Sequence, residues 1–110
     1  GRHGSGYSVR VMRHARGRGE RAPDARRVVQ HIEMTLKRFQ VRTARQRPLE
    51  QGAVQGVEVQ AIQPGGPGEV WMRGLLVGTD IYLLLAWDRE GGVFEDPAAE
   101  AFFASFRLDG

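Results

Sequence analysis

The run from Ile81 to Trp87 (IYLLLAW) is apolar along nearly its whole length. Turn-forming residues bound it, with Gly78 before it and the segment 88–96 (DREGGVFED) after it. A short apolar run between turn signals is typical of a strand, and a strand that is apolar on both faces must be covered on both faces. The sequence therefore predicts an inner strand of a sheet that carries a packing layer on each side.

Four further strands are predicted around this one from residues that alternate between apolar and polar. Their expected ranges are Tyr7 to His14, Val41 to Arg47 (stopped by Pro48), Val57 to Ile62 and Glu69 to Val77. Turns are expected at 51–56, at 78–80 (GTD), and at 63–68 (QPGGPG), where two Pro and three Gly forbid a continuous ladder. In the first strand, one face carries Tyr7, Val9 and Val11, and the other carries Ser8, Arg10 and Met12.

Two helices are expected outside the strands. Asp24 is a candidate N-cap for an amphipathic helix over 24–39, because apolar residues recur there every three or four positions. This apolar face consists of Ala25, Val28, Val29, Ile32, Leu36 and Phe39. Asp96 and Pro97 have the residue types that begin a helix, so a second, short helix is predicted after them. Its inner face is expected to hold Ala98, Ala101, Phe102 and Phe106.

The element order β-α-β-β-β-β-α predicts an α+β fold, with an antiparallel sheet of about five strands and two helices packed on it. A chain of 110 residues is long enough for one core, and it shows no repeat or internal boundary. We therefore expect a flexible N-terminal segment over 1–6 and a single α+β domain over 7–110. No apolar run approaches the roughly 20 residues that span a bilayer, so no membrane span is expected.

The composition excludes cysteine chemistry, and the charged residues are distributed unequally between the two halves of the sequence. There is no cysteine, which excludes disulfides and thiolate chemistry. Residues 1–50 hold 13 basic and 4 acidic residues, whereas residues 51–110 hold 3 and 9. All basic residues except Lys37 are arginines, which we interpret as GC-rich, bacterial codon usage. The sequence begins without Met or an apolar leader, so it is not expected to be an unprocessed secretory precursor, and it fits a soluble cytoplasmic or a mature exported form.

No residue pattern typical of catalysis or of cofactor binding is found. The serines lack a G-x-S-x-G setting, and segment 63–69 lacks the Lys-Ser/Thr of a phosphate-binding loop. His31 has no metal-ligating residue three or four positions further on, and the acidic residues of 88–96 do not have EF-hand spacing. We therefore expect no catalytic, cofactor or metal residues, and a protein that is not an enzyme.

The candidate partner-binding residues are the basic side chains of the first strand, its following loop and the outer face of the first helix. They are Arg10, Arg13, Arg16, Arg18, Arg21, Arg26, Arg27, Lys37 and Arg38. An anionic protein partner would fit them, as would the acidic half of a second copy in a head-to-tail contact that weakens with salt. Nucleic acid or another anionic surface is the alternative, although only Tyr7 and Phe39 are available here as stacking residues. A third and weaker hypothesis is an enzyme with a small pocket between helix and sheet.

Three segments resemble the PsbP/Mog/DcrB-like α/β sandwich group: 56–61 (GVEVQA), 70–87 (VWMRGLLVGTDIYLLLAW) and 96–108 (DPAAEAFFASFRL). The resemblance extends over about residues 7–108 and includes Tyr82 in the central strand and a terminal signature of Phe103, Ser105, Phe106 and Leu108. Proteins of this group are mostly non-enzymatic, and they include a subunit that stabilises the oxygen-evolving complex, a Ran-binding import factor and envelope lipoproteins. The resemblance therefore implies an interaction or assembly module without a cofactor.

The group usually has a strand or hairpin before the position of Tyr7. The resemblance therefore implies a sheet that lacks this first hairpin and has an open edge, which is a template for pairing with another chain. Taken together, the sequence predicts a non-enzymatic module that docks an anionic or edge-strand protein partner, which can be a second copy of the chain or a different protein.

Overall fold

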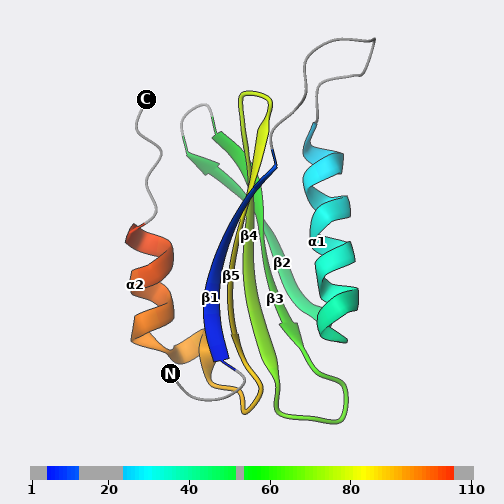
Figure 1. The fold of residues 1–110 in the computed structure, drawn as a ribbon, viewed down its shortest axis with the longest axis vertical. Helices are drawn as coiled ribbons and strands as arrows, with labels where there is room; N and C mark the ends of the chain where they lie inside the picture. The colour runs from blue at the N-terminus through cyan, green and yellow to red at the C-terminus, as the bar shows by residue number, and fades with distance from the viewer. Residues whose placement is uncertain (1–4, 13–23, 52–53, 106–110) are drawn as a thin grey trace.

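A computed structural model describes residues 5–12, 24–51 and 54–105. Five strands form one antiparallel sheet, in the order β1-β5-β4-β3-β2. The strands are β1 (Ser5–Met12), β2 (Arg42–Gln51), β3 (Val54–Ile62), β4 (Glu69–Val77) and β5 (Asp80–Asp88). The helices α1 (Ala25–Phe39) and α2 (Pro97–Ser105) lie on opposite sides of the sheet (Figure 1). The α+β fold with five antiparallel strands and two helices is thus confirmed.

The strands β2 to β5 follow one another across the sheet as a meander, and β1 adds to the far side of β5. β1 and β2 therefore form the two edges of the sheet. Because α1 comes between these two edge strands in the chain, it crosses one face of the sheet, where it packs on β4, β3 and β2. This leaves the α1 face of β1 without a helix directly over it.

The inner strand β5 divides the core into two halves, as its two apolar faces predicted. On the α1 side, Leu83 and Leu85 join a cluster that includes Ile32 and Leu36 of α1 and Met72 of β4. On the α2 side, the cluster consists of Trp71, Leu84, Ala86, Val93, Ala99 and Phe103. Each helix therefore buries a separate apolar face of the same sheet, which positions both helices firmly against it.

Both helix starts are where the sequence predicts them. The Asp24 carboxylate accepts hydrogen bonds from the backbone amides of Arg26 (3.0 Å) and Arg27 (3.3 Å). The Asp96 carboxylate accepts one from Ala98 (2.9 Å), and Pro97 is the first residue of α2. Each aspartate satisfies amides that have no partner within the first helical turn.

The range of β2 differs from the prediction. Pro48 does not stop the strand, which continues to Gln51, and β3 begins at Val54. Pro48 lacks an amide hydrogen, but an edge strand has one side on which no donor is needed, so proline is tolerated there. The connection between these strands is consequently shorter than the expected turn over 51–56.

The range of β1 also differs. It begins at Ser5, so the last two residues of the expected N-terminal segment belong to the sheet. Residues 1–4 and 13–14 lie outside the described residues.

The inner face of α2 is shifted by one residue from the prediction. Ala99 and Phe103 are buried, whereas Ala98 and Ala101 are exposed and Phe102 is half-buried. A short 3-10 helix, η1 (Val93–Glu95), lies in the segment that was expected to be an irregular loop. Because η1 contacts both β4 and α2, it sets the rotation with which α2 meets the sheet. Phe106 lies outside the described residues.

Candidate binding groove

The predicted basic set is only partly brought together. Arg13, Arg16, Arg18 and Arg21 lie outside the described residues. The other five are Arg10 on β1 and Arg26, Arg27, Lys37 and Arg38 on α1. These five side chains reach the surface, and the four helix residues divide between two sides of α1.

One side of α1 is directed towards β1. Arg27, His31, Thr35 and Arg38 follow one another at intervals of four, four and three residues, so they lie along one stripe of the helix. Lys37 lies about 100° around the helix axis from Arg38, and Arg26 lies equally far from Arg27. The Nε atom of Arg26 lies 3.9 Å from the Oδ2 atom of Asp24, and both side chains are well exposed. Arg26 and Lys37 are therefore outside the stripe.

A groove of about 150 Å³ separates this stripe from β1. Its rim consists of Ser8 and Arg10 from β1 and of Thr35 and Arg38 from α1. Its floor consists of Phe39, Leu83, Leu85 and Trp87. We call this the cationic groove. It combines positive charge at the rim with an apolar floor, because α1 packs on β4, β3 and β2 and leaves the surface beside β1 open.

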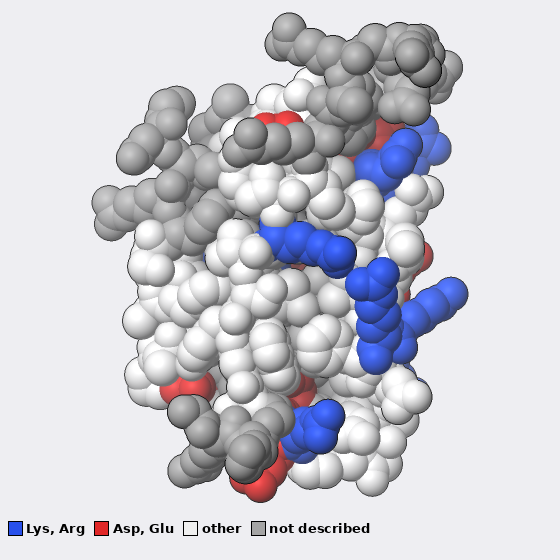
Figure 2. Space-filling model, viewed as in Figure 1, with Lys and Arg blue, Asp and Glu red and all other residues white. Residues whose placement is uncertain are grey.

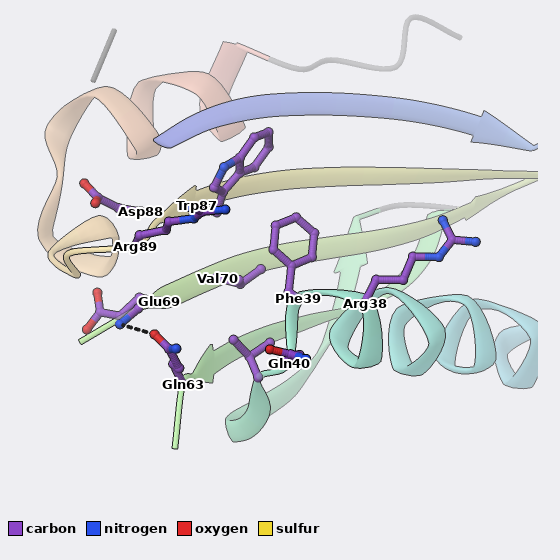
Figure 3. Close-up of a pocket in the computed structure, with 11 residues that line it drawn as sticks. Arg38, Phe39, Gln40, Gln63, Glu69, Val70, Trp87, Asp88 and Arg89 are labelled. Atoms are coloured by element: carbon purple, nitrogen blue, oxygen red, sulfur yellow. Dashed lines mark hydrogen bonds between the residues drawn. The ribbon is translucent and has the colours of Figure 1, made fainter. Parts of the chain in front are cut away.

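A second hollow, of about 620 Å³, continues the groove beyond the C-terminal end of α1. Arg38, Phe39 and Trp87 line both hollows, so the two spaces meet at these residues. The rings of Phe39 and Trp87 lie close together, with their centroids 5.6 Å apart, and Arg89 runs alongside Trp87 (Figure 3). The continuous groove therefore has an arginine at both ends of its aromatic section.

The carboxylates at the outer end of the second hollow hold the local backbone. Glu69 accepts a hydrogen bond from the amide of Gly92 (2.8 Å), and Asp88 accepts one from the amide of Glu90 (2.8 Å). In the part of the chain that the structure describes, no group of three or more His, Asp or Glu side chains is placed to hold a metal ion.

His31 lies near the charges of Arg27, on its own helix, and of Arg10, on β1. Its partial burial lowers its pKa below the usual 6.5, and the charges of Arg27 and Arg10 lower it further. His31 is therefore neutral at pH 7, and the positive potential of the groove comes from its arginines. The same observation shows that Arg10 of β1 and Arg27 of α1 act on one place, although they lie 17 positions apart in the sequence.

The charge distribution is visible on the face that carries β1 (Figure 2). Basic side chains gather over α1 and beside β1, while acidic side chains show mainly at the two ends of the molecule. The surface between them is largely uncharged. A ligand in the cationic groove would therefore meet the positive charge of Arg10 and Arg38, and it would meet carboxylates where the groove opens into the second hollow, which Glu69 and Asp88 line.

A second group of charged residues, on the α2 face, is structural. Glu58 is buried, and it accepts hydrogen bonds from Nε of Arg47 (2.7 Å) and Nε of Arg73 (2.6 Å). The strand register sets these three residues directly opposite one another on β2, β3 and β4. The guanidinium of Arg73 also lies 4.9 Å from the ring centre of Phe103. Since each charge has a partner within the group, this cluster links the three strands across the sheet.

Sequence reasoning placed Arg10, Arg27 and Arg38 in the candidate set but missed Thr35, Trp87 and Arg89. The helical spacing that places Thr35 and Arg38 on one side of α1 was the available signal for one wall. The other wall could not be found without knowing that β1 pairs with β5 rather than with a neighbour in sequence.

The chain matches no protein-family model and no curated protein. Among the described residues, no helix is long and apolar enough to cross a membrane.

Proposed function

We propose that this protein is a non-enzymatic interaction module that docks an acidic segment of a partner protein in the cationic groove. The observation that carries the proposal is the gathering of Arg10 and Arg38, from two separate elements, around an apolar floor. The resemblance to the PsbP/Mog/DcrB-like group supports the same class of function.

The chemistry of the groove indicates which partner fits. Arginine binds carboxylates through two parallel hydrogen bonds, so Asp or Glu side chains are suitable at the rim. The floor adds apolar surface from Leu83, Leu85 and Trp87, which favours a segment in which acidic and apolar residues alternate. An extended peptide places alternate side chains on opposite sides, so such a segment can lay its apolar side on the floor.

Nucleic acid fits this groove less well. Sequence-independent binding of single strands uses aromatic rings that are open for base stacking. Phe39 and Trp87 are instead partly buried and pack against the core and against each other. The nucleic-acid hypothesis therefore becomes the second arm of the test.

The enzyme hypothesis required a pocket between helix and sheet. A hollow of about 290 Å³ does lie between α1 and β2 and β3, and Arg47 is its single charged lining residue among those that the structure describes. An acid–base pair is not formed by the lining residues of that hollow, so its geometry adds no support to a catalytic role.

The test measures binding of a labelled peptide of alternating Glu and Leu by fluorescence anisotropy, together with a matched Lys–Leu peptide and an oligothymidine. The decisive variant is Arg10→Ala/Arg38→Ala, which removes both arginines that line the groove. Its matched control is Arg26→Ala/Lys37→Ala, which removes the same charge outside the groove.

We expect the Glu–Leu peptide to bind, and the groove variant to weaken that binding about tenfold, since each rim contact contributes roughly 0.5–1 kcal/mol. The control variant should change the affinity less than about twofold. Equal losses in both variants would show that net charge, and not the groove, attracts the peptide. Binding of oligothymidine with a steep salt dependence, in the absence of peptide binding, would favour the alternative partner class.

A further inference from the structure

The two edges of the sheet differ in how they are protected against pairing with another chain. The β2 edge has a bulge between Thr43 and Arg45, it contains Pro48, and it carries several charged side chains. These are the features by which proteins prevent strand addition. Over residues 6–12, the β1 edge has no bulge and no proline, and Arg10 is its single charged residue. Among the described residues, no strand pairs with the outer side of β1.

The face of β1 that points towards α2 exposes three apolar side chains at alternate positions. Tyr7 is 46% exposed, Val9 is 47% exposed and Val11 is 40% exposed. They are three of the four large apolar residues that are exposed in the described part of the chain. An unpaired edge and an exposed apolar stripe therefore coincide on one strand, which is where strand addition gains both hydrogen bonds and apolar burial.

We propose that β1 pairs with β1 of a second copy of this chain, antiparallel and across a two-fold axis at Val9, to form one continuous ten-stranded sheet. In this register, Val9 lies opposite Val9 of the second copy, and Tyr7 lies opposite Val11. All six exposed apolar side chains then form one stripe on the same face. On the other face, Arg10 lies opposite Ser8, so no like charges are directly opposed.

Other two-fold registers are less favourable. An axis at Arg10 would set the two Arg10 side chains directly opposite each other, and like charges in that position destabilise a strand pair. An axis at Ser8 would leave Val11 opposite Ser5 and shorten the apolar stripe. An odd shift would turn the stripe of one copy onto the opposite face from that of the other. The Val9 register is therefore the one in which charge and apolar pattern agree.

The position of α1 leaves room for this contact, because α1 packs on β4, β3 and β2, away from the β1 edge. On the other face, α2 lies beside Tyr7, whose ring centroid is 5.1 Å from that of Phe102 and whose hydroxyl donates a hydrogen bond to Asp96 (3.4 Å). Tyr7 is still 46% exposed, so it can contribute to the stripe together with Val9 and Val11. β1 is drawn in front of the other strands in Figure 1, and the same view in Figure 2 shows a largely uncharged surface over it. A two-fold contact between identical surfaces closes on itself, so it forms a dimer and not a filament.

The sequence has no cysteine, which permits a clean cross-linking test. The variant Val9→Cys would set two thiols directly opposite at the axis, with Cβ atoms about 4.5–5.5 Å apart, close to what a disulfide needs. The control is Val11→Cys, on the same face of the same strand and with similar exposure. In the proposed dimer its two thiols would be about 13 Å apart, since they are separated by four residues along the strand pair.

We expect Val9→Cys to form a disulfide-linked dimer at least about tenfold faster than Val11→Cys under mild oxidation, because the aligned thiols react as a preassembled pair. A mixture of Tyr7→Cys and Val11→Cys should form the mixed dimer at a rate close to that of Val9→Cys. In sedimentation equilibrium, the unmodified chain should dimerise and Val9→Lys should be monomeric while keeping the circular dichroism spectrum of the fold.

Equal cross-linking of Val9→Cys and Val11→Cys, or a monomeric unmodified chain at high concentration, would overturn the proposal. Self-association that Val9→Lys leaves unchanged and that salt abolishes would also overturn it, and would indicate the head-to-tail contact instead. None of these outcomes depends on what binds the cationic groove.

Discussion

Glu58→Gln tests the buried charge cluster on the α2 face, where one carboxylate is shared by two arginines. Burial by itself raises the pKa of Glu58, but the hydrogen bonds and charges of Arg47 and Arg73 outweigh it and hold the pKa below its usual 4.5. The amide introduced by the substitution could accept a hydrogen bond from one arginine through its oxygen, while its NH₂ group would face the N–H of the other.

The expected loss follows from these contacts. Each hydrogen bond to a charged group contributes about 1.5–3 kcal/mol, and the contact to Arg47 counts towards the lower end because that side chain is mostly exposed. We expect a decrease of about 2–3 kcal/mol in the free energy of unfolding, which corresponds to a fall in Tm of about 10 °C. Urea denaturation followed by circular dichroism measures it.

The pH dependence distinguishes a charge effect from a packing effect. Because the folded-state pKa of Glu58 is lowered, its stabilisation is fully present above the unfolded-state pKa and is lost as pH falls through the folded-state pKa. The difference in the free energy of unfolding between the unmodified chain and Glu58→Gln should therefore be constant above about pH 5 and shrink below pH 4.5.

The control is Glu50→Gln, the same substitution at an exposed position of β2, which should change stability by less than about 0.5 kcal/mol. A Glu58→Gln chain as stable as the unmodified one at pH 7, or a difference that persists undiminished at strongly acidic pH, would refute this reasoning.

Three further outcomes are expected from the same packing and charge arguments. Gly74→Ala should destabilise the fold by about 1–3 kcal/mol, because an added Cβ would lie 2.5 Å from the Cγ1 atom of Val28 and push α1 off the sheet, which urea denaturation measures. Phe103→Ala should cost about 3–5 kcal/mol and Phe102→Ala clearly less, which thermal unfolding of the two variants compares directly. His31 has a lowered pKa, so stability should fall as pH falls below about 6.5, and His31→Asn should remove that part of the pH dependence in urea titrations.

The parts of the fold that the sequence predicts correctly are those with a periodic pattern and a local end signal. α1 has both an apolar stripe and the Asp24 cap. β5 is apolar on both of its faces and is bounded by turn residues. These patterns report burial directly, because an exposed face would be polar. The strand count, the antiparallel arrangement and the two covering helices follow from such local signals.

The predictions are wrong where contact with a neighbouring element sets the end of a strand or the rotation of a helix. Pro48 stops a strand inside a sheet but not at an edge, and nothing local in 42–51 shows that β2 is an edge. The rotation of α2 depends on η1, whose residues carry no periodic signal of their own. The cationic groove depends on β1 lying beside β5, a pairing between segments about 75 positions apart. Charge composition indicated an anionic partner but could not separate Arg38 from its neighbour Lys37.

The proposed peptide binding in the cationic groove and the proposed dimerisation both use β1. Together they imply that partner binding and dimerisation influence each other. Ser8 and Arg10 line the groove on the α1 face, while the backbone of the same residues forms the pairing edge. A two-fold axis at Val9 sets the two Arg10 side chains diagonally across the strand pair, so their repulsion opposes the dimer. An acidic peptide in either groove would reduce this repulsion, and by linkage dimerisation would then raise the affinity for the peptide equally.

We therefore expect the dimerisation constant from sedimentation to increase when the Glu–Leu peptide is added and to be unchanged by the Lys–Leu peptide. In Arg10→Ser the repulsion is absent, so this variant should dimerise more tightly without peptide and respond less to it. A peptide that weakens dimerisation would instead show that the groove and the edge compete for β1.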